Sequence, residues 1–205
     1  SLDFYRAKGY LPEALINFMA FLGWHPKDDR EILNREELIG EFDLSRVQKA
    51  GAVFNIEKLD WINAQYIKKI DDEQLARLLD LGDNTAIVPL IRDRLKKLSD
   101  FKTLANWWKK SADYNAGLLI WKNTDPTTIL ENLKGVAAIL ENGGGAEDIM
   151  KLADEKGKGE VLWPLRAAIS GKDASPGPME MMAILGKQET LSRVQDAIKK
   201  LEMKN

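Results

Sequence analysis

Cysteine is absent from this 205-residue sequence, and histidine occurs once, as His25. Without cysteine the chain can form no disulfide, has no thiolate nucleophile, and lacks the usual ligands of structural zinc. A single histidine beside a proline is typical of a surface or packing residue rather than of a catalytic base. We therefore expect no metal site, and the composition fits a cytoplasmic protein.

Long apolar runs are missing as well. No stretch approaches the roughly 18 residues that a membrane span needs, and the first residues do not join a basic region to an apolar one, as a secretory signal would. The sequence thus predicts no association with a membrane. Apolar residues make up 44% and charged residues 30% of the chain, an ordinary balance for a globular protein.

The side-chain patterns of common enzymes are also absent. The sequence contains no glycine-rich phosphate loop of the Walker or Rossmann kind and no His-Glu-x-x-His. The adjacent carboxylates Asp71 and Asp72 stand at an expected helix start, where acidic side chains suit the helix dipole. We therefore predict no catalytic residue.

Charge is distributed unevenly, although the formal net charge is only −2. Residues 28–60 hold nine acidic and five basic side chains, whereas residues 92–110 hold seven basic and two acidic ones. A nucleic-acid binder is usually basic, and the near-neutral total can hide a basic surface on the second segment. Its basic residues are Arg92, Arg94, Lys96, Lys97, Lys102, Lys109 and Lys110.

Nearly every segment has a helical pattern, so the expected fold class is all-α. Asn34 with Glu37 forms a capping-box pattern, Pro12 and Pro126 suit the first position of a helix, and Asn55 is a good cap. A short strand at 52–54 is the one alternative considered, and residues 170–178 are a loop by composition. The expected helices cover residues 12–22, 34–42, 55–70, 71–81, 84–98, 101–110, 126–140, 146–156, 160–170 and 188–202.

Four groups of segments, in order along the chain, resemble one family. They are residues 5–24; residues 29–33 with 41–47; residues 52–63 with 66–67; and residues 164–171 with 175–178 and 184–187. Together they are similar to the glutamyl-tRNA synthetases, which are class I aminoacyl-tRNA synthetases. Each segment alone is a weak match, but their order and spacing cover nearly the whole chain.

The resemblance implies a stem-contact domain at 1–70, followed by two helical subdomains of an anticodon-binding domain at 71–120 and 121–205. A helical rather than β-barrel anticodon domain is typical of the bacterial or organellar type. The family's first ATP motif and lysine-rich ATP loop are absent from the sequence. We therefore expect a C-terminal fragment that is inactive alone and binds no cofactor, whereas the full-length parent would use ATP and Mg to join glutamate to tRNA.

Arg94 is the first residue that the resemblance marks for the anticodon, because it matches the arginine implicated in reading the last anticodon base. Independently, a guanidinium can form paired hydrogen bonds with a base edge or stack on an unstacked base. The alternative is a solvated helix face. The resemblance also marks a second arginine and a Pro/Gly loop, whose backbone groups suit unstacked bases, namely Arg166 with Ser175, Pro176, Gly177 and Pro178.

Weaker assignments concern the RNA backbone and the tryptophans. Trp61 is assigned to the core rather than to a stacking surface, as are Trp24, Trp121 and Trp163. Trp107 and Trp108 precede two lysines, and since neighbouring helical residues point about 100° apart, at most one of the two is expected to be exposed. Five residues are expected to contact tRNA phosphates: Arg30, Lys58, Arg92, Lys96 and Lys97.

The partner implied is a glutamate tRNA, with a glutamine tRNA left open, and the chain is expected to be monomeric. The competing hypothesis is a helical scaffold that binds proteins and has no tRNA recognition. Such a scaffold would be expected to have a neutral surface where residues 92–110 are basic.

Overall fold

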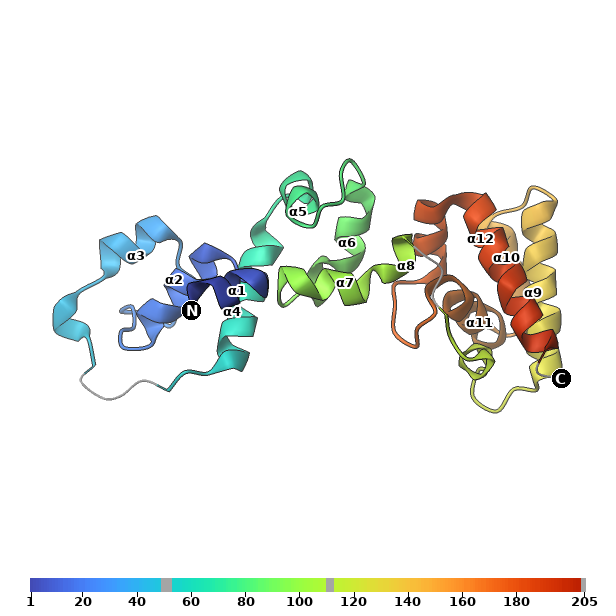
Figure 1. Ribbon diagram of the computed structural model, residues 1–205, viewed down its shortest axis with the longest axis horizontal. Coiled ribbons are helices and arrows are strands. Elements are labelled where there is room, and N and C mark those ends of the chain that lie inside the picture. The colour runs from blue at the N-terminus through green and yellow to red at the C-terminus, as the bar shows by residue number, and fades with distance from the viewer. Residues whose placement is uncertain (49–52, 110–112, 204–205) are drawn as a thin grey trace. The chain divides into compact units, whose positions relative to one another are not determined.

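The computed structural model describes residues 1–48, 53–109 and 113–203, and every regular element within those ranges is a helix (Figure 1). The all-α expectation is therefore confirmed for the described part of the chain. The chain divides into two compact units, Ser1–Thr103 and Leu104–Asn205. The division into three domains at 70 and 120 remains a prediction.

The first unit is built from short helices with well-formed caps. The Asn34 side chain accepts a hydrogen bond from the Glu37 backbone (2.9 Å), and the Glu37 carboxylate accepts one from the Asn34 backbone (2.7 Å), which is the expected capping box. Helix α2 packs on α4. The helices are α1 (Leu2–Ala7), α2 (Pro12–Phe21), α3 (Arg35–Glu41), α4 (Ile56–Lys69), α5 (Asp72–Leu78), α6 (Val88–Ile91) and α7 (Phe101–Leu104).

Buried polar side chains join distant segments of the first unit. Asn63 on α4 is fully buried; its amide oxygen accepts from the Leu11 N–H (2.8 Å), and its amide nitrogen donates to the Lys96 carbonyl (2.6 Å). Lys97 Nζ lies 3.0 Å from the Asp60 carboxylate, which also accepts from the Tyr10 hydroxyl. Burial, together with this contact to Asp60, raises the pKa of Tyr10 above its ordinary value.

One expected helix, at 84–98, is wrong. The chain instead forms a 3₁₀ helix at Thr85–Ile87, then α6, then a 3₁₀ helix at Arg92–Arg94, and turns extended at Leu95. The physical reason is competition for backbone groups. The Asp100 carboxylate accepts from the N–H groups of Lys96 and Lys97 (3.0 and 2.9 Å), and Asn63 takes the Lys96 carbonyl, so these groups cannot pair within a helix.

Two further expectations, the strand at 52–54 and the helix at 101–110, are corrected. Val53 and Phe54 have no strand structure, and Ala52, the other residue of the expected strand, lies outside the described residues. The helix expected at 101–110 is interrupted at Ala105, which separates α7 from α8 (Asn106–Lys109). Lys110 is outside the described ranges.

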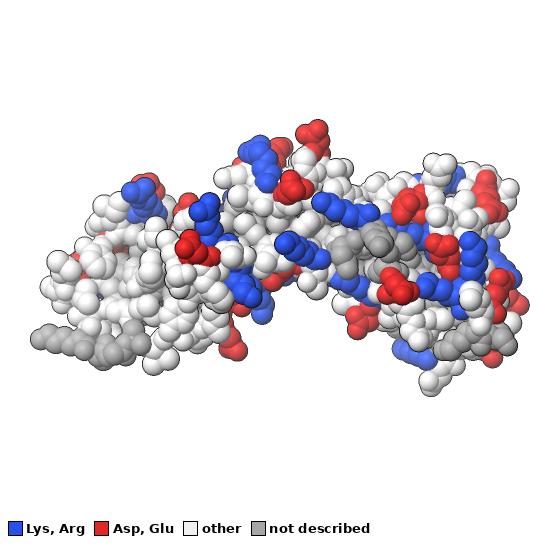
Figure 2. Space-filling model, in the orientation of Figure 1, with Lys and Arg blue, Asp and Glu red and all other residues white. Residues whose placement is uncertain are grey.

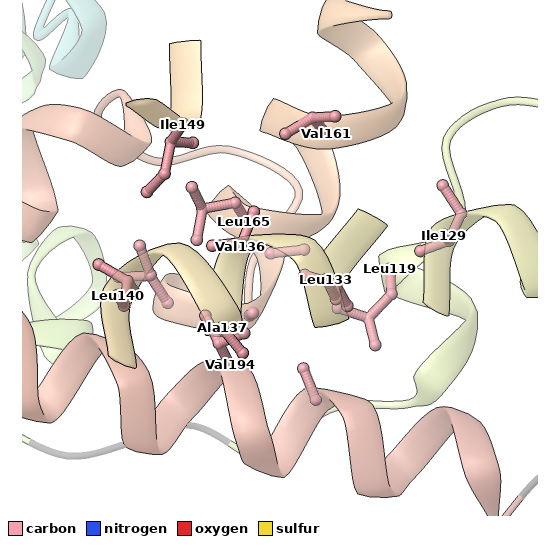
Figure 3. Close-up of a cluster of buried hydrophobic side chains, with 14 of the residues drawn as sticks. Leu119, Ile129, Leu133, Val136, Ala137, Leu140, Ile149, Val161, Leu165 and Val194 are labelled. Atoms are coloured by element: carbon pink, nitrogen blue, oxygen red, sulfur yellow. The ribbon is translucent and has the colours of Figure 1, made fainter. Parts of the chain in front are cut away.

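The second unit surrounds one apolar cluster (Figure 3). The stripe expected on residues 129–140 is buried as predicted, with α9 packed on α12 and α11. Helix α12 is kinked at Gly186, whose φ of +77° suits glycine, so the helix expected at 188–202 is its second half. The elements are a 3₁₀ helix at Ala116–Leu119, α9 (Pro126–Glu141), α10 (Ala146–Lys156), α11 (Lys158–Ser170) and α12 (Pro178–Glu202).

A buried arginine ties three helices of this unit together. Arg193 on α12 is only 2% exposed. Its Nη1 donates to the carbonyl oxygens of Trp107 (2.5 Å) and Ile169 (2.8 Å), and its Nε donates to the Glu189 carboxylate (2.7 Å). The guanidinium therefore satisfies one carbonyl in the last turn of α11 and one carbonyl of α8 that the core would otherwise leave without partners.

Candidate nucleic-acid interface

A pocket of about 420 Å³ opens on the second unit, formed by the segment before α9, helix α11 and the start of α12. These elements bring together residues that lie up to 57 positions apart in sequence. The lining combines two indole rings, two basic side chains and the Gly–Pro pair that opens α12. Its residues are Trp121, Lys158, Gly159, Leu162, Trp163, Arg166, Gly177 and Pro178.

The two tryptophans form an aromatic pair in this pocket. The ring centroids of Trp121 and Trp163 lie 5.1 Å apart with an interplanar angle of 44°. Trp163 Nε1 donates to the Leu118 carbonyl (2.9 Å), which fixes the orientation of that ring. Gly159 makes room for the other ring, because a Cβ at this position would lie 2.1 Å from Trp121 Nε1.

Basic groups stand over both rings. The Arg166 guanidinium carbon lies 4.5 Å from the centroid of Trp163, and Arg166 Nη2 donates to the Asp173 carbonyl (2.7 Å). Lys122 Nζ lies 4.9 Å from the centroid of Trp121. Such positions are typical of cation–π contacts. Half-buried aromatic rings flanked by cations can stack an unpaired nucleobase and attract its phosphate.

Only part of the predicted loop reaches the pocket. Ser175, 4% exposed, and Pro176 are buried, and the Ser175 hydroxyl donates to the Pro176 carbonyl (3.1 Å). The Gly177 N–H donates to the Glu180 carboxylate (2.8 Å). The backbone of this loop is therefore less available to a ligand than its composition indicates, and Gly177 with Pro178 form its pocket-facing part.

Arg94 and the basic residues around it, from Arg92 to Lys102, belong to the first unit. Arg94 and Lys96 are exposed, and among the described residues no carboxylate pairs with the Lys96 ammonium. Arg92 forms an ion pair with Asp72. As described above, Lys97 is held against Asp60. The structure thus places Arg94 and Lys96 at the surface of the first unit.

Two other predicted phosphate contacts are engaged with acidic neighbours in the first unit. The Arg30 guanidinium pairs with the carboxylates of Asp28 (2.7 Å), Glu37 (3.1 Å) and Glu41 (2.5 Å). Lys58 pairs with Glu31. An RNA phosphate would have to compete with these carboxylates, so the surroundings weaken both assignments.

Trp61 corrects the sequence-based assignment to the core. Its side chain is 42% exposed, and Lys58 Nζ lies 4.6 Å from its ring centroid. The buried face of α4 consists of Leu59, Ile62, Asn63 and Ile67, and Trp61 lies outside that face. Its ring therefore lies at the surface, where the Lys58 ammonium stands over it as in a cation–π contact.

Sequence reasoning also missed Trp121 and Trp163, which it assigned to the core. Both are only partly buried, whereas Trp24 is 1% exposed as expected. A signal was present. Trp121 is followed directly by Lys122, and Trp163 lies three residues before Arg166 on one helix, a spacing that places both on the same face.

The Trp107–Trp108 pair follows its prediction. Trp107 is fully buried, and Trp108 is half-buried with Lys109 Nζ 5.5 Å from its ring centroid.

Figure 2 shows basic side chains interspersed with acidic ones on the face it draws, rather than one continuous basic surface. A ligand on this face would therefore depend on local geometry more than on overall charge.

Two negative findings apply to the described ranges. No group of three or more His, Asp or Glu side chains there could hold a metal ion. No helix there is both long and apolar enough to cross a membrane.

Two family models match the chain. The anticodon binding domain model matches residues 46–198, and the model of the catalytic domain of class I tRNA synthetases (E and Q) matches residues 1–61. The first match covers most of the chain and includes every residue of the pocket described above.

Similar proteins are glutamate–tRNA ligases. That of Flavobacterium johnsoniae is 36% identical over 219 residues, covering 96% of this chain and 43% of the relative. That of Dehalococcoides mccartyi is 37% identical over 223 residues, covering 96% and 46%. A crystal structure of the glutamate tRNA ligase from Elizabethkingia meningosepticum superposes with a TM-score of 0.80 at 32% identity, covering 96% and 43%. The chain thus spans less than half the length of these relatives.

Proposed function

Because this chain belongs to the anticodon-binding domain family found in glutamate–tRNA ligases, we propose that it binds a tRNA and reads its anticodon. One observation carries the proposal beyond family membership. Two half-buried tryptophans, Arg166 and Pro178 converge on one open pocket. Sequence-specific proteins usually recognise RNA at unstacked bases in loops, and such bases stack on aromatic rings and guanidinium planes.

In the proposed complex the pocket of the second unit takes one unstacked anticodon base. The base stacks on the Trp163 ring, and the Arg166 guanidinium, whose Asp173 contact uses one of its five N–H groups, donates to the base edge. Gly177 and Pro178 line the pocket, and the buried Ser175 and Pro176 precede them in the chain. Arg94, on the first unit, is proposed to read another base.

The remaining assignments concern the longer protein that its relatives indicate. We propose that this longer protein is an ATP- and Mg-dependent ligase that joins glutamate to a glutamate tRNA in the cytoplasm, with charging of a glutamine tRNA left open. No residue of this chain is assigned to catalysis or to a cofactor. The proposed phosphate contact best supported among the five is Lys96, which is exposed.

Titration of the chain with a glutamate tRNA, and with the same tRNA carrying a different anticodon, tests this function at two salt concentrations. We expect tighter binding to the intact anticodon. Since stacking on one aromatic ring is worth about 1–3 kcal/mol per base, Trp163→Leu should weaken binding to the intact tRNA by about 5- to 150-fold and reduce the preference.

Two further variants and one control test which residues distinguish the two anticodons. Arg94→Ala and Arg166→Gln should each reduce discrimination between the two tRNAs, because both are proposed to contact base edges. Lys151→Gln is the matched control, since Lys151 is exposed on α10 and paired with Asp148 (3.3 Å) away from the pocket lining. Equal and steeply salt-dependent binding to both tRNAs would mean phosphate contacts alone and would contradict the proposal.

A further inference from the structure

The turn that connects the Ala116–Leu119 3₁₀ helix to α9 has an unusual backbone. The Thr124 N–H donates to the Trp121 carbonyl (2.9 Å), which closes a four-residue turn with Lys122 at its second position. Lys122 has a φ of +50°, and only one other non-glycine residue in the described ranges, Asp80, has a positive φ. Turns of this kind favour glycine or asparagine at such a position, because a longer side chain is strained there.

The strained backbone places a cation beside the pocket. Lys122 is exposed, and its ammonium lies 4.9 Å from the centroid of Trp121, whose ring lines the pocket. No carboxylate among the described residues forms an ion pair with Lys122, unlike Lys158 at the same pocket, which pairs with Asp154 (3.3 Å). The ammonium is therefore positioned by the turn and the indole, and not by an acidic partner.

We propose that Lys122 is a phosphate-binding residue that holds the sugar–phosphate backbone of the nucleotide whose base enters the pocket. The inference rests on the RNA-binding function proposed above and adds a residue that neither sequence patterns nor the pocket lining singled out. Each ring of the aromatic pair has a cation beside it: Lys122 stands over Trp121, and Arg166 stands over Trp163. A ligand with a flat base and an attached anion fits a site with two adjacent aromatic rings and a cation at each ring.

The roles of these two cations differ in a measurable way. Arg166 faces the base, so its removal should change which bases are preferred. A phosphate contact carries no sequence information, so removal of Lys122 should weaken all RNA ligands alike. It should also reduce the slope of log K against log salt by about 0.7, the value for one phosphate contact on a single strand.

The backbone strain provides a variant that separates binding from folding. Lys122→Asn and Lys122→Gly remove the charge and substitute residues that accept a positive φ. We expect both variants to melt at the same temperature as the unaltered chain or above it, and to bind RNA several-fold more weakly. Lys122→Arg keeps the cation and should bind nearly as the unaltered chain does.

The experiment measures the binding of the glutamate tRNA and of the tRNA with the replaced anticodon at several salt concentrations, with thermal melting of every variant. Lys151→Gln again controls for the loss of one exposed charge. A reduced salt slope with unchanged preference in Lys122→Asn is the expected result. An unchanged slope in Lys122→Asn, with tRNA still bound by the unaltered chain, would overturn this inference alone. Absence of binding by the unaltered chain would overturn the proposed function and this inference with it.

Discussion

Substitution of Arg193 by methionine should destabilise the second unit selectively. Methionine replaces the aliphatic part of the buried side chain with an unbranched apolar one, but it has no guanidinium and donates no hydrogen bond. The carbonyl oxygens of Trp107 and Ile169 would then be buried without their partner. An unsatisfied buried polar group costs about 1–3 kcal/mol, so two of them predict a loss of about 2–6 kcal/mol.

Native-state hydrogen exchange can assign this loss to one unit. Protection of amides in α11 and α12 should fall by the predicted free energy in Arg193→Met, while α2 and α4 of the first unit serve as the internal reference. Glu189→Gln is the matched control. Glu189 is half-exposed, and glutamine still offers an oxygen to Arg193 Nε, so a change of at most about 1 kcal/mol is expected. A loss below about 0.5 kcal/mol in Arg193→Met, or equal losses in both units, would refute the reasoning.

Three further substitutions follow from the structure. Gly9→Ala should unfold the first unit at lower denaturant concentration, by about 2 kcal/mol or more, because Gly9 has a φ of +79° and a Cβ would lie 2.9 Å from the Leu98 backbone nitrogen; an unchanged urea midpoint would argue against this. Gly159→Ala should displace the Trp121 indole, shift tryptophan fluorescence and weaken RNA binding, and unaltered emission with full affinity would show the ring to be unmoved. Burial and nearby carboxylates raise the pKa of Tyr66 to about 12, so the folded state favours the neutral phenol. Stability should be unaffected by this group below about pH 10 and should decrease between about pH 10 and 12, less steeply in Tyr66→Phe; equal slopes in both proteins would exclude Tyr66 as the cause.

Much of the helical structure could be predicted from short-range signals. The start of α9 follows from the Asp125 side chain, which accepts from the Thr127 N–H (2.7 Å), and its buried face follows from apolar spacing. The capping box of Asn34 is equally local. Such elements are encoded within a few residues, and for this reason the sequence alone was sufficient.

The 84–98 segment could not be predicted in the same way, because its conformation depends on a distant side chain. Asn63 accepts a hydrogen bond from the Leu11 N–H and donates one to the Lys96 carbonyl, and each partner is more than 30 positions away in sequence. Local propensity favoured one helix there. The fully buried Asn63 amide with its two partners outweighs that preference. The helical pattern of residues 84–98 does not reveal these distant hydrogen bonds.

The candidate site was predicted in part. Composition located a loop at 170–178, and the family resemblance marked Arg166 and residues 175–178, but neither showed that the Gly177 N–H donates to the Glu180 carboxylate. The Trp121 and Trp163 rings meet across two elements, a relation that no single helix pattern contains. The residues of such a site can be named from the sequence. How deeply each is buried, and which of its polar groups remain open to a ligand, depend on packing.

The contact between the two ends of the first unit has a consequence for its synthesis. The Ser99 hydroxyl donates to the Lys8 carbonyl, and the two residues are 91 positions apart. At about 5–20 residues per second, α1 leaves the ribosome roughly 5–20 s before its partner. The Lys8 carbonyl therefore lacks this partner on the nascent chain for that interval, whereas the contacts of Tyr10 with Asp60 and of Leu11 with Asn63 can form sooner.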